Sequence, residues 1–215
     1  MKKRYLVTNL FAVSLFLTAC GNDDVAKALE STTSVETQNE QIVNDLNAIS
    51  EQEKSLQGTF ETTLSEDDSL STLADKSSAV FENVETRSSS LSELKETVSA
   101  MKEEQVLLAE KTSDKLPQEE LTALSTNIEE LTASLEEYIA HYETVLAEQE
   151  TYFSDLGKEE ATYETLTAGI ETINKSDAET KALLAKLDQE LVAVQDTQAQ
   201  STASLNDLNE SSKSK

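Results

Sequence analysis

The sequence predicts an all-α fold, an up-and-down bundle of four long antiparallel helices with coiled-coil-like packing. Residues 25–215 contain one proline, three glycines and no tryptophan, and they are rich in Leu, Glu, Ala and Lys, a mixture that favours helices over turns. Apolar residues recur at alternating spacings of three and four, which places them on one side of a helix. Three short segments with helix-capping or helix-breaking residues divide this repeat into four stretches. We therefore expect a single bundle domain over residues 25–208.

The apolar repeat marks the predicted buried face of each helix. Its mean period of about 3.5 residues favours slightly left-handed packing between neighbours. The third stretch adds Ile139, Leu146 and Phe153 beside its stripe, which suits contact with two neighbouring helices and so favours a bundle. The members of the first stripe are Val25, Ala28, Val35, Ile42, Leu46, Ile49, Leu56 and Phe60.

Residues with capping or helix-breaking chemistry set the predicted helix boundaries. Gly58 and the polar residues after it separate the first two helices, and Ser65 is the expected cap of the second. Pro117 suits the first position of the third helix. Gly157 is expected in a left-handed conformation after the third helix, and Thr162 as the cap of the fourth. The predicted helices span residues 25–62, 66–111, 117–156 and 160–208, followed by a polar disordered tail at 209–215.

The alternative fold is one long hairpin of two helices. The apolar repeat stays in phase across residues 60–70 and 156–163, so these two breaks do not by themselves interrupt a helix. An even number of antiparallel helices, two or four, returns the C-terminus to the end of the body where the chain begins.

The N-terminus has the three parts of a lipoprotein signal peptide. Residues 2–4 are basic, and residues 10–17 form an apolar run too short to span a membrane as a permanent helix. A lipobox follows, with the sequence Leu17-Thr18-Ala19-Cys20-Gly21. We predict that residues 1–19 are a cleaved signal peptide whose end is recognised by the signal peptidase through Leu17, Thr18 and Ala19.

Cys20 is the only cysteine of the chain and the predicted site of lipidation. Two acyl chains, of the kind that a diacylglycerol group with palmitate supplies, bury enough methylene groups to hold a protein on a membrane without further contacts. Residues 20–24 then form the lipidated end and a short tether. The sequence therefore predicts a membrane anchor at Cys20 and a body that contains no disulfide.

The net charge limits the partners of the exported body. Removing residues 1–19 removes three positive charges and no negative one, so the formal net charge falls from −25 to −28. Such a surface repels the phosphates of nucleic acids and anionic lipids, and we predict no nucleic-acid binding. Phosphate-rich wall polymers are repelled as well, unless cations or the amines of the polymers intervene.

The sequence contains no motif of catalytic or cofactor-binding chemistry. His141 is the sole histidine, which excludes a multi-histidine metal site, and we expect it at the boundary of a helix surface. Adjacent acidic pairs such as Glu129 and Glu130 point about 100° apart on a helix and lack the spacing of a calcium loop, so they indicate solvated surface. We predict a protein that is not an enzyme, with no catalytic residue, no metal and no cofactor.

Two groups of residues within the stripes have alternative interpretations. Aromatic residues around the third and fourth helices are spaced for core packing, although exposed rings there would favour a glycan-binding platform. Arg87 lies within a stripe, where an acidic residue such as Glu53 is its expected partner and fixes helix register. The aromatic group is Tyr138, Tyr142, Tyr152, Phe153 and Tyr163, and the other polar stripe residues are Gln105, Gln149 and Gln198.

From the lipobox through the fourth helix, the chain resembles the YkyA-like family of cell-wall-binding lipoproteins of Gram-positive bacteria. The resemblance implies a lipid-anchored, helical, non-enzymatic protein on the outer face of the cytoplasmic membrane. Besides the lipobox, it rests on Arg87, Leu91, Lys95-Glu96, Glu150-Thr151-Tyr152, Leu156, Thr162, Leu166, Ile170 and Asn174.

The predicted function is a binding or structural role beneath the cell wall, with a wall polymer or another envelope protein as partner. One alternative is a ligand-binding lipoprotein for transport or signalling. It requires a concave pocket, for which close-packed stripes and scarce glycine leave little room. The other alternative is that the peptide cleaved before Cys20, which includes residues 11–19, is itself a peptide signal.

Overall fold

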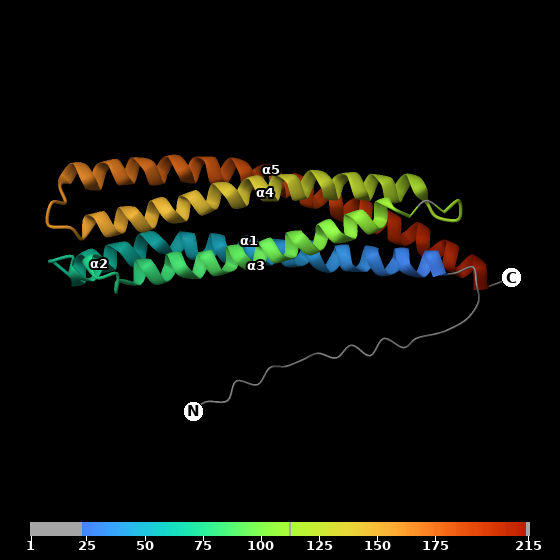
Figure 1. Ribbon diagram of the computed structural model, residues 1–215, viewed down its shortest axis with the longest axis horizontal. Helices are drawn as coiled ribbons and strands as arrows, with labels where there is room; N and C mark the ends of the chain where they lie inside the picture. The colour runs from blue at the N-terminus through green and yellow to red at the C-terminus, as the bar shows by residue number, and fades with distance from the viewer. Residues whose placement is uncertain (1–22, 112, 214–215) are drawn as a thin grey trace, which may run out of the picture.

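The computed structural model describes residues 23–111 and 113–213, which form five helices. Four of them are long and run alternately up and down, and one is a single short turn of helix (Figure 1). α1 contacts α3 and α5, and α4 contacts the same two helices, so the four long helices close into a bundle. The all-α bundle is confirmed, and the two-helix hairpin is wrong. The helices are α1 (Asp23–Glu66), α2 (Ser71–Ala74), α3 (Ala79–Ala109), α4 (Gln118–Leu156) and α5 (Tyr163–Lys213).

α1 continues through the expected break at Gly58 and ends at Glu66. Gly58 is exposed, and a Cβ added to it would meet nothing within 4 Å, so this glycine weakens the helix slightly without interrupting it. Ser65, expected as a cap of the next helix, lies in the last turn of α1, where its hydroxyl donates to the Thr62 carbonyl at 2.9 Å. The first break therefore lies further along the chain than expected.

The connection between α1 and α3 contains α2, which the sequence did not predict. Asp67 organises it, because the Thr72 backbone N–H donates to its carboxylate at 2.7 Å and the Ser69 backbone N–H at 3.2 Å. These hydrogen bonds favour the ionised form and hold the Asp67 pKa well below its usual value. α3 begins at Ala79, with Ser78 as its N-cap, instead of at residue 66. The hydrogen bonds to Asp67 thus hold the turn that follows the end of α1 at Glu66.

Gly157 ends α4 in a right-handed conformation with φ of −79°, so the expected left-handed residue is wrong. Its lack of a side chain serves packing instead. A Cβ on Gly157 would lie 2.3 Å from the backbone nitrogen of Ala74, so only glycine lets α2 pack against the end of α4. Thr162 caps α5 as expected, accepting from the Thr165 backbone N–H at 3.3 Å.

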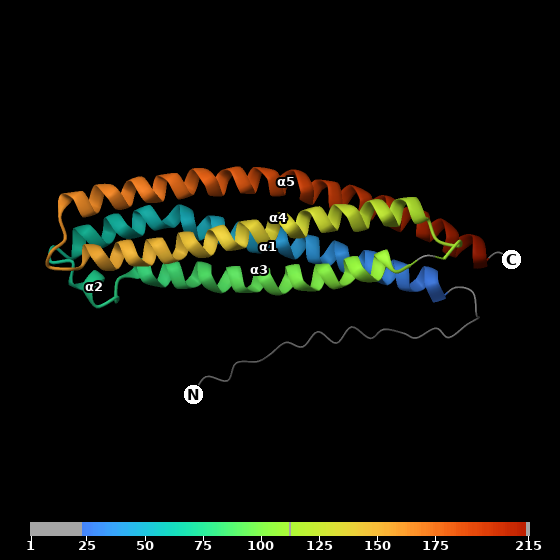
Figure 2. The same ribbon diagram turned by 45° about the horizontal axis from the view of Figure 1, so that its top comes forward.

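α5 is continuous to Lys213, so residues 209–213, expected to be disordered, are helical. Its two halves pack differently. Near the C-terminus, Leu187, Leu191, Val194 and Leu205 are buried in the core. Between residues 163 and 186, the apolar residues of the stripe are only half-buried or exposed. This half of α5 runs along α4, whose Tyr152 ring occupies the space beside Gly169 (Figures 1 and 2).

The beginning of α1 and the end of α5 lie at the same end of the bundle, as an even number of antiparallel helices requires (Figures 1 and 2). The α1–α3 and α4–α5 connections lie at the opposite end, which we call the far end. A helix of the length of α1, 44 residues, spans about 66 Å at 1.5 Å per residue. In the described part of the chain, no helix is long and apolar enough to cross a membrane.

Candidate functional site

The residues of the predicted anchor, Leu17, Thr18, Ala19 and Cys20, lie outside the described part of the chain. The segment 11–19, considered as a peptide signal, lies there as well. Lipidation at Cys20 and cleavage before it therefore remain predictions. The described residues hold the other candidate sites.

The aromatic residues form core and not a glycan platform, as their spacing predicted. Tyr138 and Tyr142 are buried one turn apart on α4, with stacked rings whose centroids are 5.4 Å apart. Tyr152 and Phe153 are buried near the end of the same helix. Tyr163 is the exception, with 80% of its surface exposed at the start of α5. A single exposed ring does not make a stacking platform.

Arg87 is fully buried, and its guanidinium donates to three neutral side chains instead of forming the expected ion pair. Its partners are Asn83 Oδ1 at 2.9 Å, Tyr142 Oη at 3.0 Å and Gln149 Oε1 at 2.5 Å. Burial raises the pKa of the Glu53 carboxyl on α1, and this effect outweighs the positive charge of Arg87, which lowers the same pKa. We call these five residues the Arg87 network.

The Arg87 network joins three helices, because Glu53 lies on α1, Asn83 and Arg87 on α3, and Tyr142 and Gln149 on α4. Burial raises the Tyr142 pKa to about 12, so its phenol stays protonated at neutral pH. A buried guanidinium with fixed partners specifies which turn of α3 faces which turn of α4. The network therefore has a structural role.

The other polar residues of the stripes also make hydrogen bonds between helices. Gln198 on α5 donates to the Thr32 carbonyl of α1 at 3.1 Å. Gln105 on α3 donates to the Ser125 hydroxyl of α4 at 3.1 Å. Their amides satisfy polar groups inside the bundle, as interior polar groups require.

A groove lies between α4 and the first half of α5, near the far end of the bundle. Its volume is about 480 Å³, within the range of sites for small ligands, and its surface is largely apolar. Val145, Tyr152 and Ile173 are the large apolar residues of its lining. α4 also contributes Thr144, Ala147, Glu148, Gln149, Thr151 and Asp155, and α5 contributes Thr165, Ala168, Gly169, Thr172 and Ser176.

Small side chains create this groove. Residues 165, 168, 172 and 176 follow the three- and four-residue spacing of one helix face, residue 169 adjoins them, and all five are Thr, Ala, Gly or Ser. At Gly169 an added Cβ would lie 2.0 Å from the ring of Tyr152, so the ring occupies the space of the missing side chain. The sequence predicted little room for a concave site, and the groove is the place where the packing of the bundle leaves such room. This stripe of small residues was the sequence signal for the groove.

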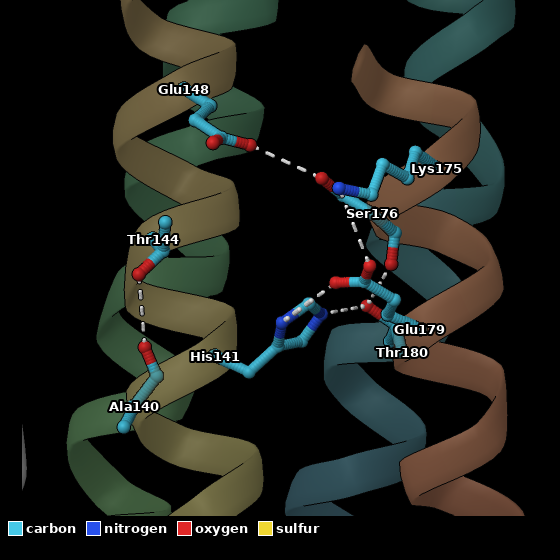
Figure 3. A network of polar contacts seen from close by, with 8 residues as sticks. All are labelled: Ala140, His141, Thr144, Glu148, Lys175, Ser176, Glu179 and Thr180. Atoms are coloured by element: carbon cyan, nitrogen blue, oxygen red, sulfur yellow. Dashed lines mark hydrogen bonds and ion pairs between the residues drawn. The ribbon is translucent and has the colours of Figure 1, made fainter. Parts of the chain in front are cut away.

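Beyond the Ser176 end of the groove, His141 connects α4 to α5 (Figure 3). Its Nε2 lies 3.0 Å from the Thr180 hydroxyl, and its Nδ1 lies 3.9 Å from Glu179. Because the Thr180 hydroxyl donates to the Ser176 carbonyl at 2.8 Å, its oxygen is left to accept from His141 Nε2–H. His141 is half-buried on the bundle surface, where the sequence placed it.

The groove carries negative charge and one unused donor. Glu148 and Asp155 line it, and its lining contains no lysine, arginine or histidine. Gln149 is 3% exposed, and its carbonyl oxygen is occupied by Arg87, which leaves the amide N–H₂ without a partner among the described side chains and backbone. These groups suit a ligand with both a cation and a hydrogen-bond acceptor. No group of three potential metal ligands occurs in the described residues.

A family model named YkyA, described as "Putative cell-wall binding lipoprotein", matches residues 23–204. The match covers all of α1 to α4 and most of α5. No curated protein and no solved structure matches the chain.

Proposed function

Because the chain belongs to the YkyA family, we propose that it is a lipid-anchored protein of the Gram-positive envelope that contacts the cell wall through the far end of its bundle. The family description joins a lipoprotein to wall binding. Cys20 precedes the first residue of α1 by three positions, so lipid at Cys20 would keep the start of α1 close to the outer face of the membrane. The far end would then extend about 66 Å toward the wall.

The observation that carries this proposal is the position of the groove. It lies between the end of α4 and the beginning of α5, in the half of the bundle that is farthest from residue 23. A concave, partly apolar surface is where a protein concentrates binding energy. A site for wall components is accessible there, while the acyl chains hold the other end in the membrane.

Wall contact through bulk charge is opposed by the formal net charge of −28 that remains without residues 1–19. Contact therefore depends on local recognition. The lining of the groove contains threonine and serine hydroxyls and two carboxylates. It contains no histidine that could activate a hydroxyl as a nucleophile, and no cysteine. This inventory supports binding without chemical conversion.

Sedimentation with isolated walls tests the proposal. The full-length protein, purified in detergent, is mixed with Gram-positive cell walls that have been stripped of protein, and the walls are pelleted. We expect most of the protein in the pellet, whereas a globular protein of similar negative charge stays in the supernatant. Equal distribution of the two proteins would refute wall contact.

The groove volume favours one second candidate, a ligand-binding lipoprotein for transport or signalling. This candidate differs from wall binding in the size and mobility of its ligand. Thermal unfolding measured across a panel of soluble metabolites distinguishes the two. A shift of several degrees with one free metabolite, together with no wall binding, would favour the second candidate.

A further inference from the structure

We propose that the groove between α4 and α5 binds short peptides that carry a free primary amine, the chemistry of uncross-linked peptides in the cell wall. This inference rests on the proposed function and names the class of ligand at the same end of the bundle. It follows from the charge, the unused donor and the shape of the groove.

The charge of the groove selects a cation. Glu148 and Asp155 both lie on the α4 side, and the lining residues carry no positive charge. The Glu148 carboxylate accepts from the Ser176 hydroxyl at 3.1 Å, and Asp155 is paired with Lys158 on the surface. A hydroxyl donor does not neutralise Glu148, so an ammonium group is the complementary partner. The same charge repels a free phosphate.

The unused donor selects an acceptor on the same ligand. Arg87 donates a hydrogen bond to the side-chain carbonyl oxygen of Gln149 at 2.5 Å. Because this contact identifies the oxygen, the other terminal atom of the Gln149 amide is the nitrogen, which is a donor. This N–H₂ belongs to a side chain that is 3% exposed, lines the groove and finds no acceptor among the described residues. A peptide carbonyl satisfies it, whereas a simple amine or metal cation does not.

The apolar lining accommodates the rest of a peptide. Tyr152, Val145 and Ile173 provide apolar surface between the two helices, and the exposed Ala168 and Thr172 leave the groove open to solvent. Its volume of about 480 Å³ accommodates a few residues with small side chains. Amine, carbonyl and small apolar groups occur together in short alanine- and lysine-containing peptides.

Fluorescence anisotropy with the full-length protein in detergent tests this inference directly. The probe is an alanine-rich pentapeptide with one central lysine, labelled through its N-terminal amine, and the matched probe has the lysine amine acetylated as well. We expect the acetylated peptide to bind at least tenfold more weakly, and we expect salt to weaken only the binding of the free amine. Equal affinity for the two peptides would overturn the inference.

Two pairs of variants locate the binding. Ala168→Leu fills the groove, and its control Ala178→Leu adds the same volume on exposed α5 surface outside it. Glu148→Gln removes the charge, and its control Glu171→Gln removes one from exposed α5 surface. We expect each groove variant to lose at least fivefold in affinity, with helicity by circular dichroism unchanged, and each control to bind normally. Normal binding by both groove variants would place the peptide elsewhere and overturn the inference.

Other occupants give distinguishable results. If the protein binds peptide-free glycan strands and no peptide, the inference is overturned and the groove is a glycan site. If it binds no peptide but forms a dimer that Ala168→Leu abolishes, the inference is overturned and the groove is an interface with a second copy. Wall sedimentation without peptide binding would overturn the inference and leave the proposed function in place. Peptide binding without wall sedimentation would refute the proposed function alone.

Discussion

Gln149 accepts a hydrogen bond from Arg87 at 2.5 Å and also lines the groove between α4 and α5. One amide thus connects the fully buried Arg87 to the candidate binding surface. Because Arg87 occupies the carbonyl oxygen, the network determines which end of the amide is available to a ligand. Packing inside the bundle and chemistry at its surface therefore share one side chain.

Replacing Arg87 should destabilise the bundle strongly. In Arg87→Leu, the acceptors of Asn83, Tyr142 and Gln149 lose their donor in a buried site. Unsatisfied buried polar groups of this kind cost about 2–5 kcal/mol in total. Urea unfolding followed by circular dichroism measures the loss. Lys54→Leu, at an exposed lysine paired with Glu51, is the control and should change the free energy of unfolding by less than about 0.5 kcal/mol.

Two glycines should respond in opposite directions to the same substitution. Gly157→Ala places a Cβ 2.3 Å from the Ala74 backbone nitrogen, so α2 must move away, at a cost of about 1–3 kcal/mol. Gly58→Ala adds a methyl group with no atom within 4 Å inside a helix, which should stabilise by about 0.5–1 kcal/mol. Thermal unfolding of the two variants checks both signs, and destabilisation by Gly58→Ala would contradict the account of α1.

Glu53 should make stability depend on pH. Burial raises its pKa in the folded protein above the usual value of 4.5, despite the opposing effect of Arg87. At a pH between the pKa of the unfolded state and the raised pKa of the folded state, the folded protein binds more protons than the unfolded chain. The free energy of unfolding therefore increases as pH falls through the folded-state pKa of Glu53. This gain is complete below pH 4.5.

Comparing wild type with Glu53→Gln isolates this effect, because the decrease in overall negative charge on acidification is nearly the same in both proteins. Urea unfolding at pH 7 and pH 5 should show a larger gain for the wild type than for the variant. Equal gains would mean that the Glu53 carboxyl titrates alike in the folded and unfolded states.

Cys20→Ala should separate anchoring from folding. Without the thiol, no diacylglycerol group can be attached, and the protein should be secreted or remain an unprocessed precursor. Its helicity should survive, because the bundle begins at Asp23. Fractionation of cells and circular dichroism of the recovered protein measure the two properties. A processed mutant retained in the membrane at the wild-type level would show that Cys20 is not the anchor.

Local signals in the sequence predicted the helices well where backbone chemistry decides. Pro117 lies directly before α4, so this helix begins within one residue of the predicted start. Thr162 caps α5 as expected. The sequence does not distinguish the roles of Gly58 and Gly157, because a glycine is equally compatible with a break, an exposed helical turn and a close contact. Which of these applies depends on what lies opposite, and for Gly157 that is Ala74, 83 positions earlier in the chain.

By itself, the sequence determined an all-α fold with an even number of antiparallel helices, two or four, because a sustained apolar period defines a buried face on every helix. Only the tertiary structure decided that a groove lies between α4 and the first half of α5. The groove exists because small residues of α5 face α4 beside the contact between Tyr152 and Gly169, and a spacing pattern within one helix does not reveal which residue of another helix faces it. For the same reason, the buried partners of Arg87 were established by helix packing.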